Sequence, residues 1–204
     1  MIIIGVTGSI GMGKSTIASM MKFLNIPVHD SDLEVKKILE NNNLVKKKVK
    51  KKWPNVISLK GDKEYINKIR LGEIVFKQPN DKCTLEKIIH PLIHKSRDNF
   101  LKKNIDKKFV VLDVPLLYET RTDKICDYIF LAYTSVKKQK TRVLSRLNMT
   151  EAKFNLIKKS QWTEEMKINQ KPYLITTSYG KTITFIIIIA YLMLITLNRN
   201  FFRS

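Results

Sequence analysis

Short apolar runs without polar interruption recur along the chain and predict buried β-strands. The clearest are IIIGVT at 2–7, FVVL at 109–112 and IFLA at 129–132, with shorter candidates at 26–29 and 173–177. Runs that do not alternate with polar residues are typical of strands covered on both faces, as in a parallel sheet.

Helical spacing of apolar residues fills the segments between these strands. Residues 14–24 place Ile17, Ala18, Met21 and Leu24 on one side of a predicted helix. Strands that alternate with helices predict an α/β fold with a parallel sheet.

A long helical stretch is predicted from Asp32. Within it, Val45, Val49 and Trp53 form a stripe that can pack while the surrounding lysines stay in water. Pro54 ends this stretch because proline cannot continue a helix.

The later segments are also helical by their pattern. Residues 65–105 predict further helices broken at Pro79-Asn80 and at Pro91, and residues 135–161 predict a basic helical stretch. Ile183 to Leu197 is nearly all apolar, but these 15 residues fall short of the ~20 that span a bilayer. A buried terminal helix is expected, with a membrane anchor as the alternative.

The composition fits one globular domain over residues 1–204. Of its residues, 44% are hydrophobic and 9% aromatic, so the chain can bury a core. Its first residues lack the basic region of a signal peptide, and Cys83 and Cys126 form no CxxC pair. A reducing compartment, the cytoplasm, is therefore expected, without a membrane partner.

Lysine dominates a strongly basic composition. Lys and Arg number 38 against 18 Asp and Glu, which gives a net charge of +20 and a pI of about 9.9. Such a charge attracts nucleotides and nucleic acids alike. Ile and Asn are also abundant, and the codons of Lys, Ile and Asn are all A/T-rich. We therefore attribute much of the charge to coding bias and expect no specific nucleic-acid partner.

Residues 8–15 read GSIGMGKS, a full match to GxxxxGK[ST], between a predicted strand and a predicted helix. Glycines let successive amides turn inward around a phosphate, and the start of a helix favours an anion. The lysine of this motif reaches the β- and γ-phosphates, and its serine hydroxyl ligates Mg²⁺. The sequence therefore predicts a triphosphate site with Mg²⁺ that comprises Gly11, Met12, Gly13, Lys14, Ser15 and Thr16.

The phosphate loop does not by itself identify the acceptor. The NKxD and DxxG motifs of GTPases are absent, since Asn67-Lys68 is followed by Ile69-Arg70 and Asp113 by Val114-Pro115-Leu116. A compact chain with this loop near its start is most simply a small-molecule kinase.

Several further motifs occur in the order found in one kinase family. They are VTGSIGMGKSTIA (family TGGIGSGKS), DSD at 30–32 (DAD), LGEIVF at 71–76 (LxxxVF), LEKIIHPLI at 85–93 (LExIxHPxI), VVLDVPLLYE at 110–119 (DxPLLFE), and Gln139, Arg142 and Arg146 (QxxRxxxR). Over about residues 1–180 the chain resembles the dephospho-CoA kinase family.

The resemblance implies ATP-dependent phosphorylation of the ribose 3′-hydroxyl of dephospho-CoA, the last step of coenzyme A synthesis. It also implies a P-loop kinase-like parallel sheet flanked by helices. A helical acceptor-binding insertion at about 33–105 and a small helical lid at about 138–165 complete this fold. The acceptor-binding residues that it implies are Asp30, Asp32, Lys36, Lys68, His90, Asp113 and Leu116.

The carboxylates among these residues suit phosphoryl transfer, which needs positioning and charge neutralisation. Asp32 follows the second strand, where ligands gather in such sheets, and is the predicted base for the acceptor hydroxyl, with Asp30 beside it. Helix capping is the alternative for this pair. Asp113 follows another strand and is predicted to hold Mg²⁺ or its waters, with a structural strand-end role as the alternative.

Two residue pairs with a spacing of four lead to different expectations. Arg142 and Arg146 would share one helical face and neutralise transition-state charge on the triphosphate, so Arg142 joins Lys14 and Asp32 as catalytic. A solvated basic helix is the alternative. His90 and His94 are not expected to bind metal, since no third ligand is near and Pro91 intervenes.

The sequence departs from the family pattern at several places, and an arginine expected around Ile157-Lys158 is missing. Lys36 and Lys68 stand where arginine is common, and lysine lacks its bidentate grip on phosphate. Lys171-Pro172 begins a segment that replaces the family's ADYVIDN, and proline fits there only at the start of a strand. Two alternatives stay open: a P-loop kinase for another nucleotide or metabolite, and a basic nucleic-acid or membrane-surface binder without catalysis.

Overall fold

The computed structural model describes residues 1–60 and 63–201, and the chain divides into two compact units. The first unit joins Met1–His29 to Asn104–Ser204, and the second is Asp30–Lys103. Each unit has a hydrophobic core of its own.

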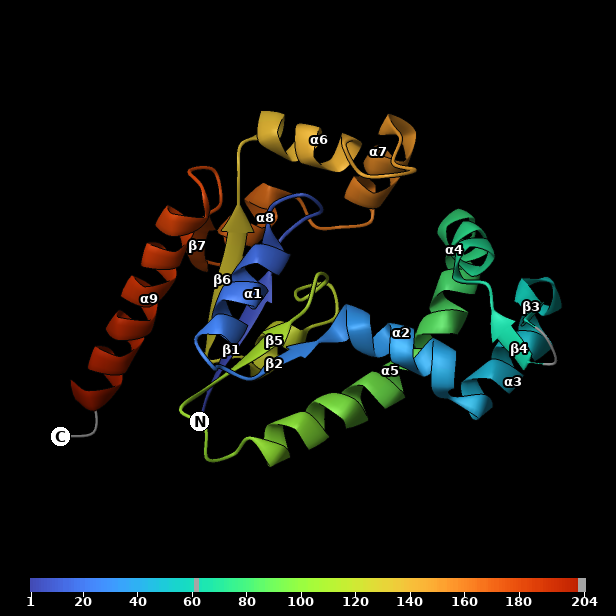
Figure 1. Cartoon of the computed structure of the whole chain (residues 1–204), viewed down its shortest axis with the longest axis horizontal. Coiled ribbons are helices and arrows are strands. Elements are labelled where there is room, and N and C mark those ends of the chain that lie inside the picture. The colour runs from blue at the N-terminus through green and yellow to red at the C-terminus, as the bar shows by residue number, and fades with distance from the viewer. Residues whose placement is uncertain (61–62, 202–204) are drawn as a thin grey trace. The chain divides into compact units, whose positions relative to one another are not determined.

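A five-stranded sheet with the order β2-β5-β1-β6-β7 forms the centre of the first unit. Its strands are β1 (Ile2–Thr7), β2 (Val28–Asp30), β5 (Phe109–Asp113), β6 (Tyr128–Tyr133) and β7 (Tyr173–Thr176). β1 pairs in parallel with β5 and β6, and β7 pairs in parallel with β6. The predicted α/β fold with a parallel sheet is confirmed (Figure 1). Pro172 lies just before β7, where proline is tolerated.

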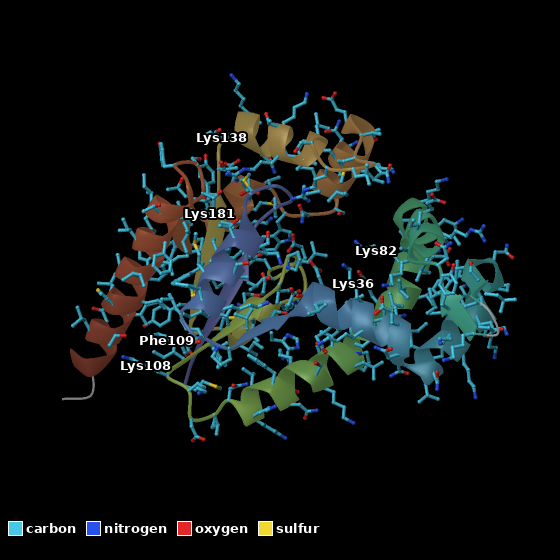
Figure 2. The ribbon with its side chains drawn as sticks, in the orientation of Figure 1. Lys36, Lys82, Lys108, Phe109, Lys138 and Lys181 are labelled. Atoms are coloured by element: carbon cyan, nitrogen blue, oxygen red, sulfur yellow. The ribbon has the colours of Figure 1, made fainter. Side chains whose placement is uncertain are left out.

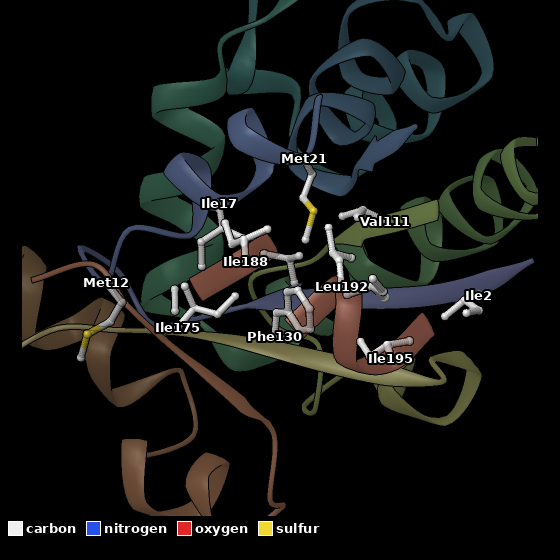
Figure 3. Close-up of a cluster of buried hydrophobic side chains, with 13 residues drawn as sticks. Ile2, Met12, Ile17, Met21, Val111, Phe130, Ile175, Ile188, Leu192 and Ile195 are labelled. Carbon is white, nitrogen blue, oxygen red and sulfur yellow. The ribbon is translucent and has the colours of Figure 1, made fainter. Parts of the chain in front are cut away.

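The first unit contains five α-helices in its described part. They are α1 (Lys14–Phe23), α6 (Val136–Leu144), α7 (Glu151–Lys159), α8 (Glu164–Ile168) and α9 (Lys181–Phe201), with a short 3₁₀ helix η2 (Thr122–Ile125). Two of them, α1 and α9, bury apolar side chains against this sheet. Ile17 and Met21 of α1 meet Ile188 and Leu192 of α9 in the same cluster as Phe130 of β6 (Figure 3). This cluster fixes the start of α1, and with it the phosphate loop, to the sheet.

Helix α9 differs from its sequence prediction in length and in burial. It extends over 21 residues, because polar residues at both ends continue the helix beyond the apolar run. Its inner side is buried, but only 22% of the stretch Lys181–Asn198 is, and its outer side exposes Ile183, Ile186, Met193, Leu194 and Leu197. Among the described residues, α9 is the one helix that is both long enough and apolar enough to cross a membrane. The expectation of a short, buried helix is wrong.

The second unit contains four helices and a β-hairpin in its described part. The elements are α2 (Ser31–Asn41), α3 (Asn43–Lys52), the 3₁₀ helix η1 (Pro54–Val56), β3 (Ile57–Lys60), β4 (Lys63–Ile66), α4 (Lys68–Lys77) and α5 (Pro79–Lys103). Its core includes Val45, Val49 and Trp53, which confirms the predicted stripe, and Pro54 follows the end of α3 as expected.

Three predictions for this segment need correction. The antiparallel hairpin β3–β4 was not expected, and the long helix from Asp32 is divided at Asn42, whose side chain accepts a hydrogen bond from Val45 N at 3.0 Å to begin α3. Pro91 does not break its helix, since α5 continues through it. Ile89 is buried in the core, and apolar neighbours on both sides of the proline pack against that core and hold the helix together.

Candidate active site

The phosphate loop joins β1 to α1 and has the backbone that an anion site requires. Gly11 and Gly13 have φ angles of 81° and 98°, in the left-handed region that favours glycine. Gly13 caps the start of α1, and no acidic residue lies in the first turn of that helix. The amides of this turn and the positive end of the helix dipole therefore face the loop without an acidic side chain from the first turn of α1.

Later residues of the chain hold this loop by hydrogen bonds. Gln139 Nε2 donates to the Ile10 carbonyl at 2.8 Å, and Gln161 Oε1 accepts from Ile10 N at 3.1 Å. Thr177 Oγ1 donates to the Met12 carbonyl at 2.7 Å. The loop is thus fixed from several sides at successive residues.

Lys14 and Asp113 come together in the first unit, although they are far apart in sequence. Lys14 Nζ lies 2.8 Å from Asp113 Oδ1, and the Asp113 side chain is only 4% exposed. Asp113 ends β5, the strand beside β1, so the sheet brings the predicted phosphate ligand and the predicted metal ligand to one place. Ser15 is exposed at the start of α1, next to Thr16.

The two arginines predicted for one helical face do not share it. Arg142 lies on α6, but α6 ends at Leu144, so Arg146 falls in the exposed turn that follows. Arg142 Nη1 donates to Thr177 Oγ1 at 2.8 Å and, at 3.5 Å, to the Gly11 carbonyl. Its Nη2 donates to the Thr177 carbonyl at 2.7 Å. Arg142 is therefore held against the loop, while the prediction of a common face is wrong.

Residues of the predicted lid to which the sequence assigned no role connect the loop to the segment after β5. Trp162 N donates to Glu119 Oε1 at 2.6 Å, and the Trp162 ring stacks on Tyr118 with centroids 5.5 Å apart. The next residues lead into α8, whose Lys167 reaches Ser9 of the loop. Single polar residues of this kind carry no motif, and a lone lysine gives no signal in so basic a chain.

The acceptor residues predicted for the second unit lie mainly on its helices. Asp30 Oδ1 accepts a hydrogen bond from Leu33 N at 3.0 Å and so caps α2, which is the capping role that the sequence left open. Asp32 and Lys36 are exposed on α2, one turn apart. Leu116, by contrast, belongs to the first unit and is half-buried after β5.

Lys68 and His90 are already engaged within the second unit. Lys68 Nζ forms an ion pair with Glu40, and this hydrogen bond lowers the pKa of the Glu40 carboxyl. The His90 ring stacks on His94, with centroids 6.1 Å apart. Among the described residues no three His, Cys, Asp or Glu side chains form a metal-type cluster.

Comparison with known proteins identifies the family of this chain. A family model described as dephospho-CoA kinase matches residues 2–188. The dephospho-CoA kinase of Zymomonas mobilis is 35% identical over 175 residues, which cover 86% of this chain and 87% of that protein. The dephospho-CoA kinase of Rhizobium meliloti is 36% identical over 186 residues, which cover 90% and 93%.

Solved structures agree on the fold. A crystal structure of a Thermus thermophilus protein superposes with a TM-score of 0.82 at 24% identity, covering 94% of this chain and 96% of that one. The dephospho-CoA kinase from Campylobacter jejuni gives a TM-score of 0.67 at 24% identity, covering 97% and 98%. With the family model and the curated relatives matching most of its length, the chain belongs to the dephospho-CoA kinase family.

Proposed function

We propose that this chain transfers the terminal phosphoryl group of ATP to the ribose 3′-hydroxyl of dephospho-CoA, giving coenzyme A and ADP. The observation that carries the proposal is the family match over residues 2–188, which includes the phosphate loop and the Lys14–Asp113 pair. The nucleotide would bind at Gly11, Met12, Gly13, Lys14, Ser15, Thr16, Arg142 and Arg146.

The loop suits a triphosphate because of its shape and charge. A Cβ at Gly11 would lie 2.5 Å from Val143 Cγ2, so only glycine leaves the backbone its close approach to α6. Lys14 would neutralise the β- and γ-phosphates, and Arg142 would face charge that grows in the transition state. Helices α6 to α8 cover most of the predicted lid at residues 138–165, whose closure would exclude water from the reaction.

The donor set near Lys14 also fits Mg²⁺. The hydroxyl of Ser15 and the carboxylate of Asp113 are hard oxygen ligands of the kind this ion prefers. When bound, Mg²⁺ would neutralise phosphate charge and orient the triphosphate. Asp113 now pairs with Lys14 at 2.8 Å, so the lysine would exchange this carboxylate for a phosphate when ATP binds.

The acceptor would bind at Asp30, Asp32, Lys36, Lys68, His90, Asp113 and Leu116. Asp32 would accept the proton of the attacking hydroxyl, since a carboxylate beside an acceptor can do so without covalent chemistry. Lys36 and Lys68 would meet phosphate as point charges. The two described cysteines form no disulfide, which is consistent with a cytoplasmic location. The cytoplasmic location stays a prediction. The absence of a membrane or nucleic-acid partner also stays a prediction.

A single assay with matched variants tests this function. The purified chain with ATP, Mg²⁺ and dephospho-CoA should yield coenzyme A and ADP, and Lys14→Ala should abolish turnover. Asp32→Asn should keep ATP binding, measured by calorimetry, but lose ~100-fold or more in kcat, as expected for a missing general base. Asp106→Asn, an exposed carboxylate in a turn, is the control and should leave kcat unchanged.

Other outcomes point to the alternatives. No turnover with dephospho-CoA, but phosphorylation of another nucleotide or metabolite, would reject the acceptor. Tight, salt-dependent binding to polynucleotide or anionic vesicles that survives Lys14→Ala, without turnover, would favour a binding protein. Near-normal kcat in Asp32→Asn would reject Asp32 as the base.

A further inference from the structure

Lys167 of α8 is an ammonium group enclosed in the core of the first unit. It is 0% exposed, although lysine is almost never fully buried without a partner. Burial lowers the pKa of its side chain. Because burial of a charged ammonium group is energetically unfavourable, we expect a specific interaction to stabilise it.

The close partner of Lys167 is a hydroxyl of the phosphate loop. Lys167 Nζ donates to Ser9 Oγ at 2.6 Å, whereas the nearest carboxylate oxygen with which it pairs, Glu164 Oε1, lies 3.9 Å away. Ser9 is itself only 5% exposed. The buried charge is thus directed at the loop more closely than at its acidic neighbour.

The serine in this contact differs from the family stretch quoted for the loop. The loop reads TGSIGMGKS, and Ser9 stands at the second glycine of the family stretch TGGIGSGKS. A glycine has no hydroxyl to offer the lysine.

The residues that precede Lys167 connect the start of α8 to the loop. Gln161 Oε1 accepts from Ile10 N at 3.1 Å, next to Ser9. Trp162 is bound to Glu119 through its backbone amide at 2.6 Å and stacks on Tyr118 with the ring planes 9° apart. Lys167 therefore projects from a support that is fixed both to the loop and to the segment after β5.

We propose that Lys167 is a positioning residue for ATP, because its bond to Ser9 fixes the first half of the phosphate loop in its binding conformation. The proposal rests on the proposed ATP site. Lys167 contacts the loop through its serine side chain, while Lys14 acts from the helix end. Loss of the contact should therefore weaken nucleotide binding and leave the acceptor side unchanged.

A double-mutant cycle tests this role. Lys167→Met and Ser9→Ala should each raise the KM for ATP and the Kd for ADP about tenfold, as for loss of one charge-assisted hydrogen bond. The double variant should be no weaker than the weaker single variant, because both changes remove the same bond. The KM for dephospho-CoA and kcat should change less than about twofold. Lys107→Met, which removes an exposed lysine between α5 and β5 outside the loop and the predicted lid, is the control and should change neither constant.

The other outcomes overturn the proposal. Additive effects of the two substitutions, or a KM for ATP that does not change, would show that the contact does not position the loop. A purely structural role would lower the unfolding temperature and the active fraction of Lys167→Met without changing either nucleotide constant. If that variant does not fold, Ser9→Ala alone decides, since it removes one hydroxyl. The Kd for ADP needs no turnover, so failure to make coenzyme A would reject the proposed acceptor and leave this test intact.

Discussion

At the residue scale, burial is the main cause of a raised pKa beside the candidate site. Tyr118 is 4% exposed, and its hydroxyl has no hydrogen-bond partner within the described chain. Desolvation, aided by the charge of Asp123, raises the pKa of Tyr118 to about 12. The folded protein therefore keeps this proton at a pH where the unfolded chain loses it.

This difference predicts a specific loss of stability in alkali. The unfolded pKa is near 10.0, so the contribution is constant below pH 10 and is lost as pH rises toward 12. Relative to Tyr118→Phe, the native protein should lose roughly 2 kcal/mol by pH 12. Denaturant unfolding of both proteins from pH 8 to 12 measures it, and parallel curves would contradict the raised pKa. The comparison cancels the titration of the many lysines, which both proteins share.

At the element scale, the turn from β1 into α1 needs glycine for two reasons: a left-handed backbone angle and the lack of room for a side chain. Gly13 has a φ of 98°, and a Cβ there would lie 2.7 Å from Thr177 Oγ1. We expect Gly13→Ala to abolish ATP binding and to destabilise the fold by ~2–4 kcal/mol, from the left-handed backbone and the overlap together. Calorimetry with ADP and denaturant unfolding measure the two effects.

Gly180 is a matched control for that substitution. Its φ is 92°, but a Cβ there would meet nothing within 4 Å. Gly180→Ala should therefore cost only the backbone component, ~1–2 kcal/mol, and leave ATP binding unchanged. Equal losses in both variants would mean that contact with Thr177 does not restrict the loop.

Also at the element scale, the strands of the main sheet could be predicted from the sequence, whereas the hairpin β3–β4 and the continuous helix α5 could not. The apolar runs predicted the strands of the main sheet, since strands buried on both faces have a local signal. The hairpin β3–β4 has only a weak signal in the sequence, because its strands ISLK and KEYI are four residues long and half polar. Pro91 inside α5 was misinterpreted because packing on both sides of it outweighs a local preference.

The candidate site divides in a similar way. The loop has a motif, and Asp113 follows a recognisable strand, so both are evident in the sequence. Gln161, Lys167 and Thr177 have no spacing rule, because their positions depend on how the later helices pack against the loop. Arg142 was found by resemblance, but its bonds to Thr177 follow from tertiary structure.

At the scale of the whole molecule, the positive charge is distributed rather than concentrated. Lys36, Lys82, Lys108, Lys138 and Lys181 lie on or beside different elements of both units (Figure 2). This spread agrees with an origin of the charge in codon usage. It predicts that a single surface lysine contributes little to the stability of the fold or to ATP binding.

Three exposed lysines of α3 provide the test. Lys47, Lys48 and Lys51 form no ion pair within the described part of the chain, and replacing all three by Gln lowers the net charge of +20 by three. The free energy of unfolding should change by less than ~0.5 kcal/mol per site. The KM for ATP should change less than about twofold, since salt at physiological concentration screens the charges of exposed lysines. A several-fold rise in KM would instead indicate that the lysines of α3 attract the nucleotide.

The hydrogen bonds around the phosphate loop also have a consequence for the synthesis of the protein on the ribosome. Residues 8–15 leave the ribosome well before Gln139, Gln161, Lys167 and Thr177, which hold them. In a nascent chain the loop is therefore present long before the residues that hold it in place for nucleotide binding. Cellular ATP would then stabilise finished molecules selectively and leave incomplete ones to proteolysis.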